Sequence, residues 1–284
     1  MEIEPSDIQR RAAYFDKLAF RLPSEPSEAF LGELWRHARH LDLGAGHPIL
    51  GSDQHLLLTV FGARPTGLEM LATLQHLSIN RVEVALDVIL NDQAAKRRLH
   101  QLFNTNFVQP WHKGKQTFEY PDGTYREIRR LPGRNYKWYC DKPDRIWNNP
   151  HCFHLEGCHQ GIRAVRRLGL QNCTDLLSFD FASYWRDHLR LFEVDLDRLG
   201  RFHNNRLTGQ RRRSAWQKIC CTFCYNADRA RGSVLFRSRA AHSMQEVRSV
   251  QQFVDCYGRG PFLVPLDVSI FIPEPFEVLP HIYA

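Results

Sequence analysis

Three strand-like segments of this sequence carry acids, a histidine and a tyrosine on the side that their apolar residues leave open. Carboxylates and an imidazole are ligands for Mg²⁺ or Mn²⁺, and such an ion stabilises negative charge on a phosphate oxygen. A tyrosine beside it can attack phosphorus and form a covalent intermediate. The residues that alternation places on this open side are Glu83 and Asp87 in 81–90, Lys137 and Tyr139 in 135–142, and His154 and Glu156 in 151–158.

Strand geometry limits which of these acids can share one ion. Glu83 and Asp87 are four residues apart, and a flat strand separates such positions by roughly 13 Å. One of the two acids is therefore expected to lie outside the ion's immediate ligands, unless the strand bends. The alternative is that these acids only form ion pairs, with Arg81 or Lys137 as partners.

Tyrosine is the candidate nucleophile, and the sequence offers several. Tyr139 shares the open side with the acids, while Tyr136 and Tyr125 remain alternatives. A tyrosine in a strand is also commonly a packing residue with its hydroxyl at the rim. With an ordinary pKa of about 10, any of these phenols needs a nearby cation or base to attack at neutral pH.

The elements that would position these residues alternate between strand and helix. Residues 80–90 give the clearest strand, because Val82, Val84 and Leu86 begin a strict apolar alternation. The pattern Asp122-Gly123 predicts a hairpin turn. No glycine-rich phosphate loop is present. We therefore predict an α+β fold, with a central antiparallel sheet and helices on one face, over residues 1–190. Residues 191–284 are predicted to be a basic, mostly helical segment and a Pro-rich tail.

The positive charge is concentrated in one segment. The chain has 284 residues and a formal net charge of +7, and residues 198–240 hold 11 basic residues against one acid. An arginine-rich segment on a nearly neutral body predicts a polyanionic partner, with a solvated charged face as the alternative. The candidate DNA-contacting residues are Arg163, Arg166, Arg167, Arg211, Arg212, Arg213 and Lys218.

The motifs around the candidate site resemble those of rolling-circle replication initiators of the plasmid trans-acting Rep type. The matching stretches are R-V-E-V-A-L-D, Y-K-W-Y-C-D-K and F-H-L-E, followed by a basic helix, within residues 79–170. The resemblance implies an HUH-nuclease-like fold that lacks the histidine pair. It implies Glu83, Asp87 and Glu156 as metal-site acids and Tyr139 as the nucleophile. Glu83 replaces the family's usual aspartate, and His154 stands where the family more often has arginine.

The resemblance implies metal-dependent, tyrosine-mediated nicking and joining of one DNA strand at a replication origin. The expected cofactor is Mg²⁺ or Mn²⁺, and the expected partner is single-stranded DNA or an origin hairpin. Two alternatives remain: a non-catalytic DNA-binding initiator or regulator, and a nuclease that hydrolyses without a covalent tyrosine step. The sequence leaves the oligomeric state open.

Two further expectations concern cysteines and location. No apolar stretch of about 18 residues and no signal-peptide pattern is present, so we expect a cytoplasmic protein without a membrane span. Cys221 and Cys224 form a zinc half-site, and Cys152, His154, Cys158 and His159 cluster elsewhere. Without a second closely spaced pair, buried reduced thiols are the simpler interpretation.

Overall fold

The computed structural model describes residues 3–45, 56–74, 77–109, 115–120, 123–130, 134–195, 197–198, 225–228, 233–237, 244–247, 249–257 and 262–272. The chain forms two compact units, each built from separate stretches of sequence. The first unit comprises residues 1–100, 113–186 and 269–284, and the second comprises residues 101–112 and 187–268. The predicted division of the chain at residue 190 stays a prediction.

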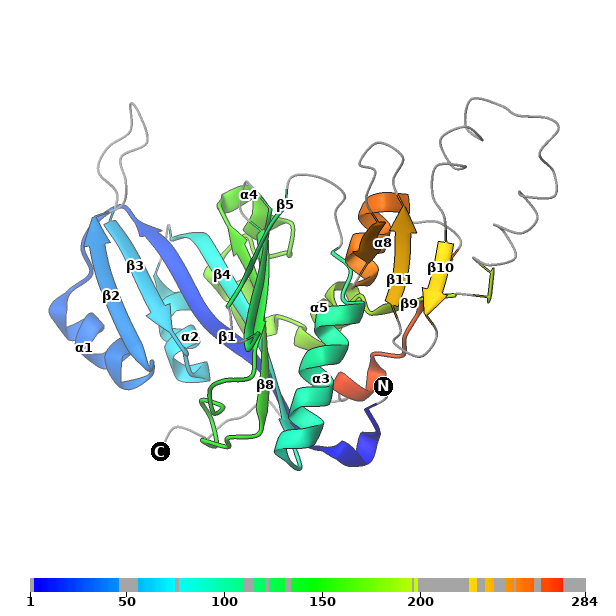
Figure 1. Cartoon of the computed structure of the whole chain (residues 1–284). Helices are drawn as coiled ribbons and strands as arrows, with labels where there is room; N and C mark the ends of the chain where they lie inside the picture. Colours follow the sequence, from blue (N-terminus) through cyan, green and yellow to red (C-terminus); the bar gives the residue numbers. More distant parts are fainter. Residues whose placement is uncertain are drawn as a thin grey trace, which may run out of the picture. The chain divides into compact units, whose positions relative to one another are not determined.

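The first unit is built on an eight-stranded sheet in the order β2-β3-β1-β4-β8-β7-β6-β5 (Figure 1). Every neighbouring pair in this sheet is antiparallel. The predicted α+β class with a central antiparallel sheet is therefore confirmed. The strands are β1 (Ile8–Leu22), β2 (His40–Ala45), β3 (Leu56–Phe61), β4 (Ser78–Leu90), β5 (Lys115–Glu119), β6 (Tyr125–Arg130), β7 (Arg134–Tyr139) and β8 (Cys152–Gln160).

Helices pack on one face of the central strands, as predicted. The Trp185 indole donates a hydrogen bond to the Ala85 carbonyl at 3.3 Å, which fixes α5 against β4. On β1, the ring centroid of Phe15 lies 5.1 Å from that of Phe179 and 4.9 Å from that of Phe181. We refer to this side of the sheet as the helix face. The helices of the unit are α1 (Glu28–Arg36), α2 (Pro65–Thr73), α3 (Gln93–Asn106, which continues into the second unit), α4 (Ile162–Arg166) and α5 (Phe181–His188), with the 3₁₀ turns η1 (Pro5–Asp7), η2 (Cys173–Ser178) and η3 (Ser269–Phe271).

Strand β4 is buried on both of its faces from Val82 to Leu90. The apolar alternation found in the sequence faces the helices, where Val84 and Leu86 are fully buried. The opposite side of β4 carries Glu83 and Asp87, whose exposed fractions are 3% and 0%. Two acids on an inner strand must therefore be satisfied by charged or hydrogen-bonding neighbours, because unpaired charges are costly to bury.

Gly157 on β8 is required by close packing against α5. A Cβ atom at this position would collide with the Tyr184 hydroxyl and lie 3.2 Å from the Tyr136 ring. We expect Gly157→Ala to lower the free energy of unfolding by about 1–3 kcal/mol, because overpacking forces neighbouring side chains off their rotamers. Urea unfolding measures this. Gly44→Ala on β2 is the matched control, since nothing lies within 4 Å of its Cβ position; an equal loss in both variants would contradict the packing explanation.

Within its described residues, the second unit contains two small sheets and a helix besides the end of α3. Val108, Val250 and Val254 form a buried cluster with Phe192, Val194 and Leu263 packed against it. Its described elements are β9 (Phe192–Val194), β10 (Tyr225–Asp228), β11 (Ser233–Arg237), β12 (Met244–Val247), α8 (Val250–Tyr257) and β13 (Leu263–Pro265).

The basic segment was predicted to be mostly helical, and residues 225–228 and 233–237 contradict this. Residues 225–228 and 233–237 are strands of a three-stranded antiparallel sheet. The run Val234-Leu235-Phe236 has the β-branched and aromatic residues that strands favour, and the count of basic residues carried no information on this point. No helix in the described part of the chain is long and apolar enough to cross a membrane.

Candidate active site

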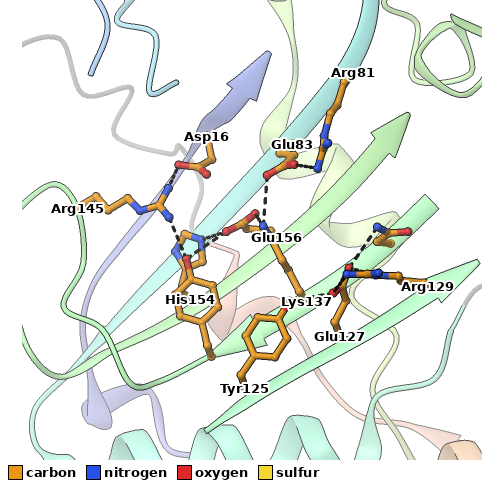
Figure 2. Close-up of polar contacts among 12 residues, drawn as sticks. Asp16, Arg81, Glu83, Tyr125, Glu127, Arg129, Lys137, Arg145, His154 and Glu156 are labelled. Atoms are coloured by element: carbon orange, nitrogen blue, oxygen red, sulfur yellow. Dashed lines mark hydrogen bonds and ion pairs between the residues drawn. The ribbon is translucent and has the colours of Figure 1, made fainter. Parts of the chain in front are cut away.

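The face of the sheet opposite α5 carries a connected set of charged side chains, shown in Figure 2. Strands β4, β8 and β7 are adjacent, and their register pairs Asp87 with His154, Lys137 with Glu156, and Tyr139 with His154. Because side chains alternate across a strand, this register places the predicted residues of all three strands on one face. We call this side the polar face.

Three acids meet on the polar face. One carboxylate oxygen from each of Asp16, Glu83 and Glu156 lies within 4.8 Å of the others, and all three residues are buried. Asp16 comes from β1 at a register shift, where Phe15 pairs with Val84 and the next pairing joins Lys17 to Glu83. A bulge of this kind inserts an extra residue and re-aims its side chain. We call Asp16, Glu83 and Glu156 the acid cluster.

Cationic side chains neutralise the acid cluster. The Lys137 ammonium lies 3.4 Å from Glu83 Oε2 and 2.5 Å from Glu156 Oε2. Arg81 pairs with Glu83, and Arg145 pairs with Asp16 (Figure 2). The alternative interpretation of Glu83, an ion pair with Arg81 and Lys137, is therefore what the structure contains. A cation that binds the acid cluster must compete with Lys137 for two of its carboxylates.

The two glutamates of the acid cluster have opposite electrostatic character. Burial raises the pKa of Glu83, and the charge of Glu156 adds to the effect. Burial alone would also raise the pKa of Glu156. The hydrogen bond and charge of His154, with the charge of Lys137, outweigh burial and hold that pKa well below its ordinary value. Glu156 is therefore the carboxylate that stays ionised, while Glu83 takes up a proton more readily.

His154 connects Glu156 to Asp87. Its Nδ1 contacts Asp87 Oδ1, and its Nε2 lies 2.8 Å from Glu156 Oε1. The Tyr14 hydroxyl donates to Asp87 Oδ2 at 3.0 Å. Burial would lower the pKa of His154, but the two carboxylates outweigh it and raise the pKa to about 9. A protonated imidazole has no lone pair for a metal, so in this arrangement His154 holds the two carboxylates in position.

The titration of His154 makes a pH-dependent contribution to stability. Its pKa in the folded protein, about 9, exceeds the ordinary value of 6.5. Protonated His154 therefore stabilises the folded state fully below pH 6.5, and this stabilisation is lost as the pH rises through about 9. The loss lowers the free energy of unfolding by about 3 kcal/mol. We expect the free energy of unfolding, measured in the presence of a chelator, to decrease over this pH range. An NMR titration of the His154 ring in the folded protein should have a midpoint near 9; a midpoint at or below the ordinary value would contradict the network.

Tyr139 is the tyrosine that contacts the acid cluster. Its hydroxyl donates to Glu156 Oε1 at 3.1 Å and accepts a hydrogen bond from Arg145 at 3.2 Å. Burial raises the pKa of Tyr139, and the charge of Glu156 raises it further, while Arg145 acts in the opposite direction. The phenol is therefore protonated in this state, with an ionised carboxylate on one side and a cation on the other.

The other two candidate tyrosines are placed differently. The Tyr125 hydroxyl donates to Glu127 Oε2 at 2.9 Å, and its ring lies parallel to that of Tyr139, with centroids 6.2 Å apart. Tyr136 lies on the helix face, where its ring is close to the Gly157 Cα, and it is 1% exposed. The structure therefore brings Tyr139 to the acid cluster, places Tyr125 next to it, and puts Tyr136 on the opposite side of the sheet.

The four residues predicted to bind metal divide into two pairs. Glu83 and Glu156 belong to the acid cluster, whereas Asp87 and His154 support Glu156 from one side. The donor set of the cluster, three carboxylates, matches the oxygen ligands that Mg²⁺ and Mn²⁺ prefer. The strand-geometry argument that Glu83 and Asp87 do not share an ion agrees with this placement. Metal binding itself stays a prediction.

Sequence reasoning missed Asp16 and Arg145. Asp16 and Lys17 interrupt an otherwise apolar stretch, AAYFDKLAF, and this charged pair was the available signal. Arg145 follows β7 in the segment before β8, where nothing in the local pattern points to the site. Of the possible zinc ligands, His154 and His159 lie on opposite faces of β8, since the His159 ring contacts the Tyr184 hydroxyl at 2.9 Å. Cys221 and Cys224 lie outside the described residues.

The predicted DNA-contacting residues fall into two groups. Arg163 and Arg166 lie in α4 and Arg167 caps it, and all three side chains are exposed. The predictions for Arg211, Arg212, Arg213 and Lys218 lie outside the described residues.

No family model matches the chain, and no curated protein matches it. Among solved structures, the chain is similar to one described as the rolling circle replication initiator protein from Geobacillus stearothermophilus. That match has a TM-score of 0.37 and 8% sequence identity, and it covers 63% of this chain and 87% of that chain.

Proposed function

We propose that this protein nicks and rejoins one DNA strand through a covalent intermediate on Tyr139, in the initiation of replication at an origin. The observation that carries the proposal is the contact of the Tyr139 hydroxyl with both Glu156, at 3.1 Å, and Arg145, at 3.2 Å, at the edge of the acid cluster. A nucleophile oriented by a hydrogen-bond acceptor and lying beside a cation that stabilises its anion is suited to covalent catalysis. The sequence resemblance to rolling-circle initiators over residues 79–170 supports the role in replication.

The chemical step follows from these contacts. The Tyr139 oxygen bonds to phosphorus and the bond from phosphorus to the 3′ oxygen breaks, which leaves a 5′-phosphotyrosine and a free 3′ hydroxyl. Glu156, which stays ionised, orients the hydroxyl by accepting its hydrogen bond, and the phenol proton passes to solvent. A second proton, from solvent, neutralises the departing 3′ oxygen. Attack of a 3′ hydroxyl on the phosphotyrosine reverses the step and rejoins the strand.

Asp16, Glu83 and Glu156 would hold the divalent cation. When bound, Mg²⁺ or Mn²⁺ would stabilise negative charge on the phosphate oxygens as the new bond forms. Lys137 would then leave its position between the two glutamates, and its ammonium would be available to the phosphate. Arg145 stabilises the phenolate form of Tyr139, because its charge opposes the effects that raise the pKa.

Access to Tyr139 requires movement of side chains from the segment between β7 and β8. Tyr139 is 6% exposed, and Arg145 and Lys142 from this segment contact its hydroxyl and ring. A phosphodiester must therefore displace at least one of these side chains before the phenol can reach phosphorus. Both are cations, so a phosphate can pair with the side chain that it displaces.

The experiment distinguishes three functions. The protein is incubated with a library of single-stranded oligonucleotides and Mn²⁺, and denaturing electrophoresis detects protein joined to DNA. We expect a band shifted by covalent DNA that disappears in a chelator. Free cleavage products without a shifted band would replace the proposal with a hydrolytic nuclease. Binding without cleavage would replace it with a non-catalytic DNA-binding protein.

A further inference from the structure

A pocket lined by arginines lies where four strands of the large sheet end. It has a volume of about 530 Å³, and Arg21, Asn80, Arg134, Gln160, Arg163 and Arg167 line it. Arg21 is near the end of β1, Arg134 begins β7, and Gln160 ends β8. Because these strands are antiparallel, these positions meet at one end of the sheet, next to α4 (Figure 1). We call this site the arginine pocket.

The charged residues that line the arginine pocket are all positive. Four of its lining residues are arginines, and none is an acid. In the described part of the chain, Arg21, Arg163 and Arg167 have no ion pair with a carboxylate, in contrast to Arg81 and Arg145 on the polar face. Guanidinium groups without internal carboxylate partners attract anions from solution, and their planar fork fits phosphate.

The arginine pocket is separate from the acid cluster. None of Asp16, Glu83, Glu156 or Tyr139 lines it. Arg134 lies two residues before Tyr136 on β7, so alternation places it on the helix face. An anion in this pocket would therefore be held away from the residues that carry the proposed chemistry.

The lining distinguishes between arginines that look equivalent in sequence. Arg163 and Arg167 are one helical turn apart and both line the pocket, whereas the equally exposed Arg166 does not. The lining also adds Arg21 and Arg134, which are 113 residues apart in the chain and which the sequence did not single out.

We propose that the arginine pocket binds the phosphate backbone of a DNA strand and anchors that strand outside the catalytic site. Several guanidinium groups in a wide pocket suit consecutive phosphates better than one isolated ion. No aromatic residue lines the pocket to stack on a base, so the contacts are to the backbone and independent of sequence. The proposal rests on the proposed function only in taking DNA as the polyanion, because anchoring does not require that the strand is cut.

The test measures binding and requires no cleavage. Fluorescence anisotropy in a chelator gives the affinity of the full chain for a labelled 20-nucleotide single strand over a series of salt concentrations. Each lost phosphate contact reduces the slope of log affinity against log salt by about 0.7 for single strands, so the double variant Arg163→Gln/Arg167→Gln should reduce it by about 1.4. Arg166→Gln removes an equivalent charge from the same helix outside the pocket and should leave the slope nearly unchanged.

A variant of another pocket residue and a check of folding complete the test. Arg21→Gln, on a strand far in sequence from α4, should reduce the slope by about 0.7, and circular dichroism should show that each variant is folded. An unchanged slope in the folded double variant, or an equal reduction in Arg166→Gln, would overturn the proposal. Pyrophosphate that binds the wild-type protein more tightly than the oligonucleotide would also overturn it, in favour of a small phosphate compound. A protein that binds in this way but forms no covalent adduct would leave the anchor intact and refute only the nicking function.

Discussion

Tyr139→Phe is expected to abolish the covalent protein–DNA adduct while the protein still binds DNA. The substitution keeps the aromatic ring and removes the oxygen that would attack phosphorus. It also removes the hydrogen bonds to Glu156 and Arg145, which costs about 1–2 kcal/mol of stability. The adduct is measured by denaturing electrophoresis after incubation with single-stranded DNA and Mn²⁺, and DNA binding by anisotropy.

Tyr125→Phe is the matched control for this prediction. It makes the same chemical change on a ring that is parallel to Tyr139 at 6.2 Å, but its hydroxyl contacts Glu127 and not the acid cluster. We expect this variant to form the adduct. Loss of the adduct in Tyr125→Phe with retention in Tyr139→Phe would assign the nucleophile to Tyr125.

Glu156→Gln is expected to have the largest effect on both stability and metal affinity. Glu156 is fully buried and contacts Lys137, His154 and Tyr139. Removing this charge from the buried ion network leaves Lys137 with Glu83 and His154 with Asp87 as their remaining carboxylates, so the free energy of unfolding should fall by about 3–5 kcal/mol. Loss of a carboxylate from the acid cluster should weaken Mn²⁺ binding at least about tenfold.

Calorimetric titration with Mn²⁺ and urea unfolding measure the two effects of Glu156→Gln. Glu69→Gln is a suitable control, because Glu69 is exposed on α2 and should change stability by less than about 0.5 kcal/mol. Wild-type affinity for Mn²⁺ in folded Glu156→Gln would remove Glu156 from the metal site. Wild-type stability would contradict the buried network.

Local patterns were sufficient to predict much of the sheet and of the site. The alternation of Val82, Val84 and Leu86 gave the orientation of β4, and with it the side on which Glu83 lies. The same reasoning on β7 and β8 placed Lys137, Tyr139, His154 and Glu156 on one face, because side-chain direction within a strand depends only on position along it.

Features that depend on contacts between distant segments could not be predicted in this way. Asp16 reaches the acid cluster through a bulge between β1 and β4, and single-strand patterns do not reveal the register of two strands. Arg145 contributes from an irregular segment between β7 and β8, where no alternation assigns a side-chain direction. The lowered pKa of Glu156 could not be predicted either, because it depends on His154 and Lys137, which lie on two different strands.

The most direct test of the central claim is to identify the residue that becomes joined to DNA. The adduct formed with single-stranded DNA and Mn²⁺ is treated with nuclease and protease, and mass spectrometry locates the peptide that carries a 5′-phosphonucleotide. The account predicts that this group is on Tyr139, in the sequence Arg134-Asn-Tyr-Lys-Trp-Tyr139. A modification on any other residue, or cleavage of the DNA without a modified peptide, would contradict it.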